Sequence, residues 1–274
     1  MPPSLLSDFR EYVKIMNQHD LYNDEIINID SCRFLSPTVV LPLMSWVFNY
    51  DKKIKEHVNP VTNEHLLKIL GLIKHNTTTL PFRRIEKAKD NSTELTKDIL
   101  HIMDYPKEND QALKFIFYEL ITNVYDHSNF NKGFVIGQNY PNVDTADFCF
   151  MDNGISIPGS FENYGYSFDN DCDAIIKAIN GLSTKDEKAY VDRGTGLNNT
   201  VSIVTNGGNG SVLIVSGTGL VQVTKNRIIA RTIPEDYLKG TLISLRLKND
   251  KVINIYENLG HIDYDLPDRI KNLK

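Results

Sequence analysis

The sequence of 274 residues predicts an α+β fold, with a mixed, mostly antiparallel sheet that carries helices on one face. Two observations lead to this prediction. Four short apolar segments follow one another between residues 211 and 247, separated by turn residues, which is the pattern of an antiparallel meander. Amphipathic helical segments precede them, and such helices bury their apolar stripes against a sheet. We expect a small α/β domain over 1–85, the larger domain over 86–255, and a polar tail over 256–274.

Composition excludes several classes of protein. Apolar residues make up 41% of the chain, enough for a substantial core. The formal net charge of −5 gives no electrostatic support for a nucleic-acid partner. No apolar run approaches the roughly 18 residues of a membrane span, and the first residues lack the apolar region of a signal peptide. The three cysteines share no metal-ligand spacing and cannot all pair. These features indicate a cytoplasmic protein.

The first 85 residues read as a small α/β unit. Ser36 suits a helix N-cap and Pro37 the first helical position, so a helix is expected to begin there. The segment 76–93 contains a proline and several charges and is expected to be a connector. The expected elements are a helix within 1–20, a strand at 25–30, a helix at 37–50 and a helix at 63–75.

The second part of the chain is richer in regular patterns. We expect helices at 93–103, 115–128, 171–180 and 197–205. We expect strands at 133–140, 146–151, 211–216, 220–224, 227–233 and 241–247. Between these lie an irregular Gly-, Asn- and aromatic-rich segment, 158–170, and a loop, 181–196. The last 25 residues are polar and are expected to be a tail or a closing helix.

The helix at 115–128 carries polar residues that a purely structural helix does not need. At about 100° per residue, one side forms an apolar stripe. That stripe consists of Leu113, Phe117, Leu120 and Val124. Glu119, Asn123 and Asp126 form a second stripe about 100–120° away. A buried carboxylate without a partner is costly, so this stripe either meets water as an ordinary polar surface or lines a site.

Two further segments contain residues suited to a ligand. Asp152 ends an apolar strand, and its carboxylate accepts hydrogen bonds only. The alternative is an ordinary strand-ending turn, Asp152-Asn153-Gly154. Gly194 and Gly196 precede a helix, where backbone N–H groups favour phosphate; the alternative is a flexible loop.

These segments, taken in order, resemble the GHKL ATPase superfamily, which includes gyrase, a heat-shock chaperone, histidine kinases and a mismatch-repair ATPase. The resemblance covers residues 105–250 and rests on four motifs in sequence order. They are Glu119–Asn123–Asp126, Asp152-Asn153-Gly154-Ile155-Ser156, Arg193-Gly194-Thr195-Gly196-Leu197, and Gly240-Thr241. The resemblance implies a Bergerat-type α/β sandwich that binds ATP and Mg²⁺. The family has a second glycine where this chain has Ser156, which puts the local turn geometry in doubt.

The resemblance implies a role for each motif in nucleotide binding. Asp152 would accept the adenine amino group, with Gly154 letting the backbone pass close to the base. Thr241 would lie near Asp152 and a water; the alternative is an ordinary β-branched strand residue. Asp126 would order water or contacts on the adenine side. His127, beside it, is expected to be a supporting or surface histidine.

The resemblance also implies how the phosphates are held. Asn123 would ligate Mg²⁺, and Glu119, one turn earlier, would be the general base. The loop 158–193 would be a lid over the nucleotide. The residues Gly194, Thr195, Gly196 and Leu197 would surround the phosphates. Lys185 and Arg193 would neutralise phosphate charge, although the ordinary alternative for both is solvation.

The N-terminal unit resembles a STAS-like module, the fold of bacterial anti-sigma antagonists. The similar stretch is EIINIDSCRFLSPTVVLPLMSWV, residues 25–47. In that family a phosphorylated serine begins the helix. Here Pro37 holds the acceptor position, so no phosphorylation switch is expected, and Ser36 is interpreted as a helix cap.

Three functions follow as expectations. The first is an ATP-binding and ATP-hydrolysing protein whose nucleotide state controls its contact with an unidentified protein partner. The second is a serine/threonine protein kinase of the anti-sigma type, in which Glu119 polarises a partner's hydroxyl. The third is a nucleotide-binding regulator that does not hydrolyse ATP. A sensor histidine kinase is not expected, because no helix pair with an acceptor histidine precedes the ATPase part. The sequence leaves a homodimer open.

Overall fold

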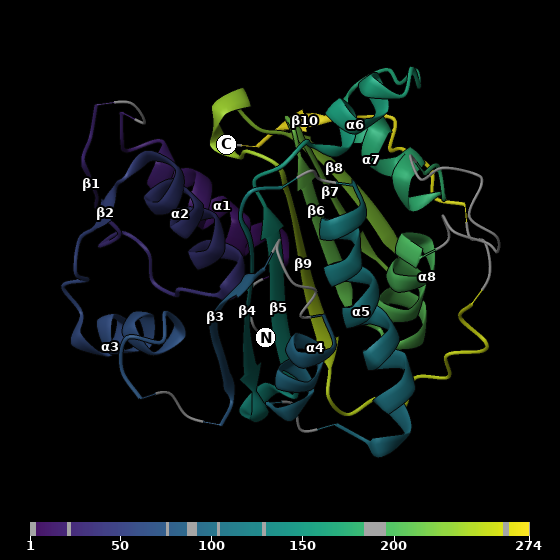
Figure 1. Ribbon diagram of the computed structural model, residues 1–274, viewed down its shortest axis with the longest axis horizontal. Helices are drawn as coiled ribbons and strands as arrows, with labels where there is room; N and C mark the ends of the chain where they lie inside the picture. The colour runs from purple at the N-terminus through teal and green to yellow at the C-terminus, as the bar shows by residue number, and fades with distance from the viewer. Residues whose placement is uncertain are drawn as a thin grey trace.

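The computed structural model describes residues 4–20, 23–74, 77–86, 92–102, 105–127, 130–183, 196–259 and 263–273. Over these residues the chain forms eight α-helices and one large, mostly antiparallel sheet (Figure 1). The α+β class is therefore as predicted. The helices are α1 Leu5–Met16, α2 Pro37–Tyr50, α3 Pro60–Ile69, α4 Ser92–His101, α5 Asp110–His127, α6 Ile157–Asn163, α7 Asp171–Ile179 and α8 Gly196–Ser202.

The large sheet has eight strands in the order β10-β8-β7-β6-β9-β5-β4-β3. Its strands are β3 Thr79–Ile85, β4 Gly133–Tyr140, β5 Thr145–Asp152, β6 Ser211–Ser216, β7 Gly219–Thr224, β8 Arg227–Thr232, β9 Thr241–Lys248 and β10 Lys271–Asn272. Among the described strands of this sheet, β10 and β8 form the one parallel pair. Of the expected four-strand meander, β6, β7 and β8 pair in sequence order, but β9 does not follow β8 and instead inserts between β6 and β5. This insertion brings the end of β5 beside the start of β9.

Helices cover both faces of the sheet: the helices of 86–255 pack on one face, and α1 and α2 of the expected first domain cover the other, which was not expected. Figure 1 shows α1 and α2 on one side and α4, α5, α7 and α8 on the other. β5 is buried along its whole length. Phe148 and Phe150 join the core under α5, whereas Cys149 and Met151 join the core under α1 and α2. Since successive strand residues point to opposite faces, a strand with no exposed position needs both faces covered.

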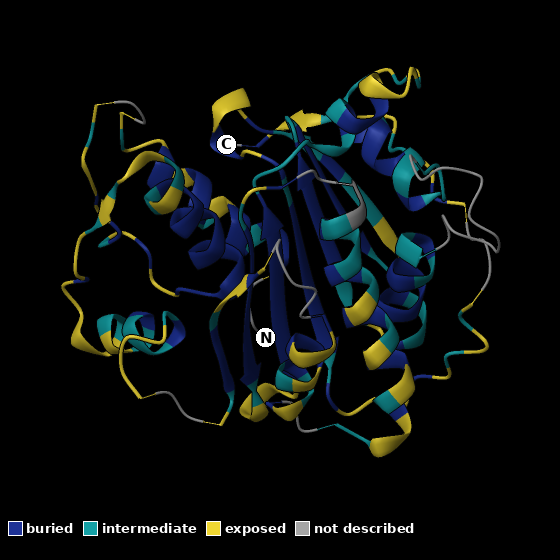
Figure 2. Ribbon diagram, in the orientation of Figure 1, coloured by how far each residue is buried: buried dark blue, intermediate teal, exposed yellow. Residues whose placement is uncertain are grey.

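Figure 2 shows the resulting burial, with dark strands between two helical layers whose outer surfaces are exposed. α5 begins at Asp110 and is held by its apolar stripe: Leu113, Phe117, Leu120 and Val124 are all buried. Phe117 makes an edge-to-face contact with Phe148 of β5, with 4.9 Å between ring centroids. This packing fixes which side of α5 faces away from the sheet.

One strand lies where a connector was expected. β3, within 76–93, pairs antiparallel with β4 at the edge of the large sheet. Its register shifts between Leu80 and Arg83, a bulge that includes Pro81. Proline removes a backbone donor, and edge strands tolerate that loss. The strand that ends the expected first domain at residue 85 therefore belongs to the sheet of the second.

The C-terminal segment packs back onto the sheet. Tyr264 and Leu273 are buried, and the Leu273 N–H donates to the Thr232 carbonyl over 2.8 Å. Asn180 bonds the backbone of Tyr264 through both ends of its amide. The polar segment expected as a tail or closing helix thus supplies β10 and two core residues.

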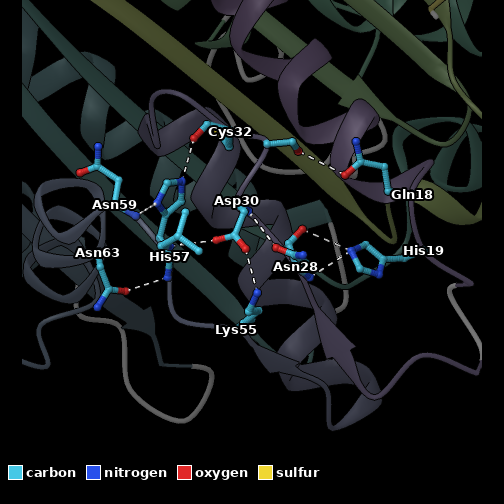
Figure 3. A network of polar contacts seen from close by, with 11 residues as sticks. Gln18, His19, Asn28, Asp30, Cys32, Lys55, His57, Asn59 and Asn63 are labelled. Carbon is cyan, nitrogen blue, oxygen red and sulfur yellow. Dashed lines mark hydrogen bonds and ion pairs between the residues drawn. The ribbon is translucent and has the colours of Figure 1, made fainter.

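The N-terminal unit contains a small parallel pair, β1 Ile26–Ile27 with β2 Lys53–Ile54, joined through α2. A polar network closes it (Figure 3). Asp30 accepts the Lys55 ammonium at 2.8 Å and the Val58 N–H at 2.9 Å. His57 Nδ1 accepts the Asn59 N–H, so Nε2 carries the proton that reaches the Cys32 carbonyl at 3.0 Å. These contacts connect the segments around residues 30–32 and 55–59, and all of them lie within the N-terminal unit.

Candidate functional site

The turn after β5 is built around two polar side chains. Asp152 is the last residue of β5 and is buried, and its Oδ1 accepts the Gly154 N–H at 2.8 Å. Asn153 Oδ1 accepts the N–H groups of Asn131 and Lys132, at 3.1 and 2.8 Å. The turn is therefore fastened to the chain entering β4, and the Asp152 carboxylate is held at the end of the strand.

The start of β9 lies directly beside Asp152. Thr241 is the register partner of Asp152, and Gly240 precedes it with φ +88°. A Cβ at Gly240 would lie 2.1 Å from the Asp152 carbonyl oxygen. Both the positive φ and this close approach require glycine. The residue pair Gly240-Thr241 thus fits against Asp152 through backbone contact.

Ser216 extends this row to a third strand. It ends β6 opposite Thr241, and the two hydroxyl oxygens lie 2.8 Å apart. The Ser216 hydroxyl also accepts the Ile157 N–H, at 2.8 Å, from the first residue of α6. Ser156 caps the same helix by accepting the Gly159 N–H at 3.1 Å. Asp152, Thr241 and Ser216 therefore align across β5, β9 and β6, next to the start of α6.

The second part of the candidate site lies on α5. Glu119 and Asn123, one turn apart, are half-buried, whereas the apolar stripe of the helix is buried. A Cβ at Gly196 would lie 2.0 Å from Glu119 Oε2. Glu119 therefore points at the first residue of α8 and has a place there only because that residue is glycine. α5 packs on β5, α8 packs on α5, and Figure 1 shows both helices on the same face.

Several expected site residues lie outside the described residues. These are Lys185, Arg193, Gly194 and Thr195, together with the side chain of Asp126. Leu197, in α8, is half-buried and packs against the core beneath α5, an ordinary apolar position. The structure thus brings together Asp152, Gly154 and Thr241 at the strand ends, and Glu119 and Gly196 between two helices.

Sequence reasoning missed Ser216, and it named Asn153 and Gly240 only within their motifs. Ser216 is a polar residue that ends an apolar strand beside the turn Gly217, which is a weak signal. Its partners are distant in sequence and become visible only when β6 and β9 pair. Loop 158–170, expected to be irregular, holds α6; the Ser156 cap and Pro158 in its first turn are the signal that could have revealed it.

A second group of carboxylates lies under α1, on the opposite face. Arg246 donates from Nε and an amino nitrogen to both oxygens of Asp147, at 2.7 and 2.6 Å, and reaches Asp8 at 3.1 Å. All three side chains are buried. Burial raises the pKa of Asp8 to about 7 and also raises the pKa of Asp147, while Arg246 opposes both shifts. The charged side chains of this cluster bond one another, and the cluster joins α1 to β5 and β9.

The three cysteines are free and buried, and burial raises the pKa of the Cys32 thiol to about 11. No group of three or more His, Cys, Asp or Glu side chains in the described part of the chain is placed to hold a metal ion. Across the same residues, no helix combines the length and apolar character that crossing a membrane requires.

No model of a known protein family matches the chain, and no curated protein matches it either.

Proposed function

We propose that this protein binds ATP with Mg²⁺ and hydrolyses it, and that its nucleotide state controls contact with a partner protein. In this proposal the sheet with α4 to α8 is a Bergerat-type fold of the GHKL superfamily, and the N-terminal unit is STAS-like. The observation that carries the proposal is the row Asp152–Thr241–Ser216 at the strand ends, next to Gly240, whose backbone approaches Asp152 closely.

The row offers the hydrogen-bonding pattern that adenine needs. A carboxylate accepts only, so Asp152 suits the adenine amino group and disfavours the guanine carbonyl at that position. Ser216 already accepts the Ile157 N–H. When its own proton goes to Thr241 Oγ1, the Thr241 proton is left for an acceptor, either a ring nitrogen or a bridging water. An acceptor beside a donor matches the edge of adenine.

The phosphates would lie toward α5 and α8. Mg²⁺ prefers oxygen ligands and keeps several waters, so the Asn123 amide oxygen and phosphate oxygens suffice. Asn123 is half-buried and lies on the same polar stripe of α5 as Glu119. Bound Mg²⁺ would neutralise phosphate charge. Residues 185 and 193–196 remain proposed phosphate contacts, and Asp126 a proposed water-ordering residue.

Glu119 is the proposed catalytic residue. It lies one helical turn from Asn123, so a water near an Asn123-bound ion falls within its reach. A carboxylate that takes the proton from this water acts as general base, which is worth about 10²–10⁴ in rate. Its place against Gly196 supports the role, because the start of α8 is where phosphate would be held.

A protein serine/threonine kinase is the second candidate. The same Glu119 would take the proton from a partner's hydroxyl instead of from water. The parallel β1–α2–β2 unit favours it, because this is the part that resembles anti-sigma antagonists. Ser36 does not act as a phosphorylation site in this proposal, since its hydroxyl is fully buried. Mass measurement of an added partner after incubation with ATP separates the two functions; a regulator that only binds would show neither activity.

Titration calorimetry with a slowly hydrolysed ATP analogue tests the binding site. Asp152→Asn replaces an acceptor by an amide that can oppose the adenine amine, and should cost about 1–3 kcal/mol of binding free energy. Asp250→Asn is the matched control, because Asp250 also follows a strand but is exposed. Unchanged affinity in a folded Asp152→Asn protein would place the base elsewhere, and no binding by the wild-type protein would remove the proposed function.

A further inference from the structure

The N-terminal helices reach both turns that carry the proposed base site, from the opposite face of the sheet. We call these turns the Asp152 turn, residues 152–154, and the Thr241 turn, residues 236–241. α2 packs on β5 and β4, and α1 packs on β6 and β9. Figure 1 shows both helices behind the sheet relative to α5. The ends of α1 and α2 contact the two turns from this face.

The end of α2 holds the Asp152 turn. Asn49 Oδ1 accepts from Asn153 Nδ2 at 3.2 Å, and Asn49 Nδ2 donates to Ser45 Oγ at 3.0 Å. The second bond orients the Asn49 amide, so its oxygen faces Asn153. One residue earlier, the Phe48 carbonyl accepts the Lys132 ammonium at 2.6 Å. Both the Asp152 turn and the chain that it is fastened to are thus attached to α2.

The end of α1 holds the Thr241 turn. Tyr12 donates its hydroxyl to the Tyr237 carbonyl, and Tyr237 donates its own hydroxyl to Asn17 Oδ1. Trp46 of α2 donates to the Tyr12 hydroxyl at 2.9 Å, so this oxygen serves both helices. Tyr12 is fully buried. Tyr237 lies three residues before Gly240, whose backbone meets Asp152.

Side-chain packing and hydrogen bonds together hold the Thr241 turn, because Tyr237 and Leu238 are buried in the core that α1 and α2 cover. A small hollow of about 10 Å³ lies between α2 and this turn, and Trp46, Leu238 and Met151 of β5 line it. Met151 is the neighbour of Asp152 in β5 and points to this face. Asn49 and Tyr237 also line this hollow, and their hydrogen bonds connect the ends of α2 and α1 to the two turns.

We propose that Asn49 and Tyr237 are positioning residues for base recognition, through which the α1–α2 layer sets the affinity of the site for adenine. Asn49 acts through Asn153 on Asp152, and Tyr237 acts through Gly240 on Thr241. This inference rests on the proposed ATP site. Linkage is reciprocal. A nucleotide that needs both turns in place stabilises the packing of α1 and α2 on the sheet, and loosening α1 and α2 lowers the affinity for the nucleotide. A partner that binds α1 or α2 then has a route to the nucleotide site.

The test is the ratio of affinities for ATP and ITP, which lacks the amino group, measured by calorimetry on the full chain. Asn49→Ala removes the bond to Asn153 together with the bond to Ser45, and Tyr237→Phe removes the bond to Asn17. Each change should lower this ratio about three- to tenfold. Asp30→Ala is the matched control: it breaks the network of Figure 3 in the same unit but touches neither turn, and should leave the ratio unchanged.

A purely structural role would lower the affinities for ATP and ITP alike and leave their ratio at the wild-type value. If both variants fold and keep that ratio, the inference is overturned while the ATP site stands. If Asp30→Ala lowers the ratio as much as they do, the effect is general loosening and the inference is likewise overturned. If the wild-type protein binds ATP without preferring it over ITP, base recognition by these turns fails and the inference is overturned, while ATP binding stands; only the absence of ATP binding would remove the proposed function.

Discussion

The two faces of the sheet hold carboxylates in different surroundings. Under α1, Asp147 and Asp8 are buried against the guanidinium group of Arg246 in a closed cluster. On the other face, Glu119 of α5 is half-buried against Gly196, and Asp152 accepts a backbone N–H from its own turn. Residues of one chemical type thus lie in two kinds of surroundings. Closed ionic partners mark a structural carboxylate, whereas half-exposure next to glycine backbone favours a ligand site.

The largest effect should come from the closed cluster. Arg246→Met leaves Asp8 and Asp147 buried without a cation, which should cost about 3–5 kcal/mol of unfolding free energy. Denaturant unfolding measures this loss. Arg227→Met, at an exposed position of β8, is the matched control and should change stability little. A small loss for Arg246→Met would mean that water reaches the cluster and that the two faces differ less than we describe.

A smaller effect, on activity instead of stability, is expected at the other face. Gly196→Ala places a methyl group where the Glu119 carboxylate lies, so this side chain must move. ATP turnover should fall about ten- to hundredfold, as expected for a misplaced catalytic group. Stability should hold, because alanine favours a helix more than glycine does. In a Glu119→Gln background, Gly196→Ala should lower ATP turnover almost no further. An additive loss of turnover would show that Gly196 does not act through Glu119.

The effect that is smallest per step, counted for each pH unit, concerns the titration of Asp8. The pKa of Asp8 is raised from 3.8 to about 7 by burial, with Asp147 adding to the shift and Arg246 opposing it. The folded chain then binds this proton more tightly than the unfolded chain. Its stabilising contribution is complete below pH 3.8 and is lost as pH rises through 7.

The unfolding free energy should therefore fall across this window by at most about 1.4 kcal/mol per pH unit through this group. Asp8→Asn should flatten that decline, and Asp250→Asn, at an exposed position, should not. Identical pH profiles for the wild-type protein and Asp8→Asn would show that Asp8 keeps an ordinary pKa in the fold.

Local patterns predicted most of the larger unit. The strands from Gly133 to Lys248 and helices α5 and α7 lie where periodicity and turn residues place them. The missed elements have physical causes. β3 contains Pro81 and two arginines, a composition that only an edge position tolerates. The second helical layer was missed although the apolar run of β5, Ala146–Met151, is typical of a strand covered on both faces.

The candidate site was predicted residue by residue, and the expectation that Thr241 lies near Asp152 came from the family resemblance and not from any local pattern. Asp152 and Thr241 meet because β9 inserts beside β5, a long-range pairing that no local pattern contains. Ser216 and Asn49 could not be identified from the sequence for the same reason. Each is one polar residue in an apolar element, and its partner lies far along the chain.

The central claim is that the face carrying α5 hydrolyses ATP, and phosphate release tests it most directly. Glu119→Gln keeps the size of the side chain and the helix propensity but removes the base. With Mg²⁺ present, the wild-type protein should release phosphate from ATP, and Glu119→Gln should do so at least about a hundredfold more slowly while binding ATP with near-normal affinity. Phosphate release by Glu119→Gln at the wild-type rate would contradict the catalytic role of Glu119 and with it this account of the site.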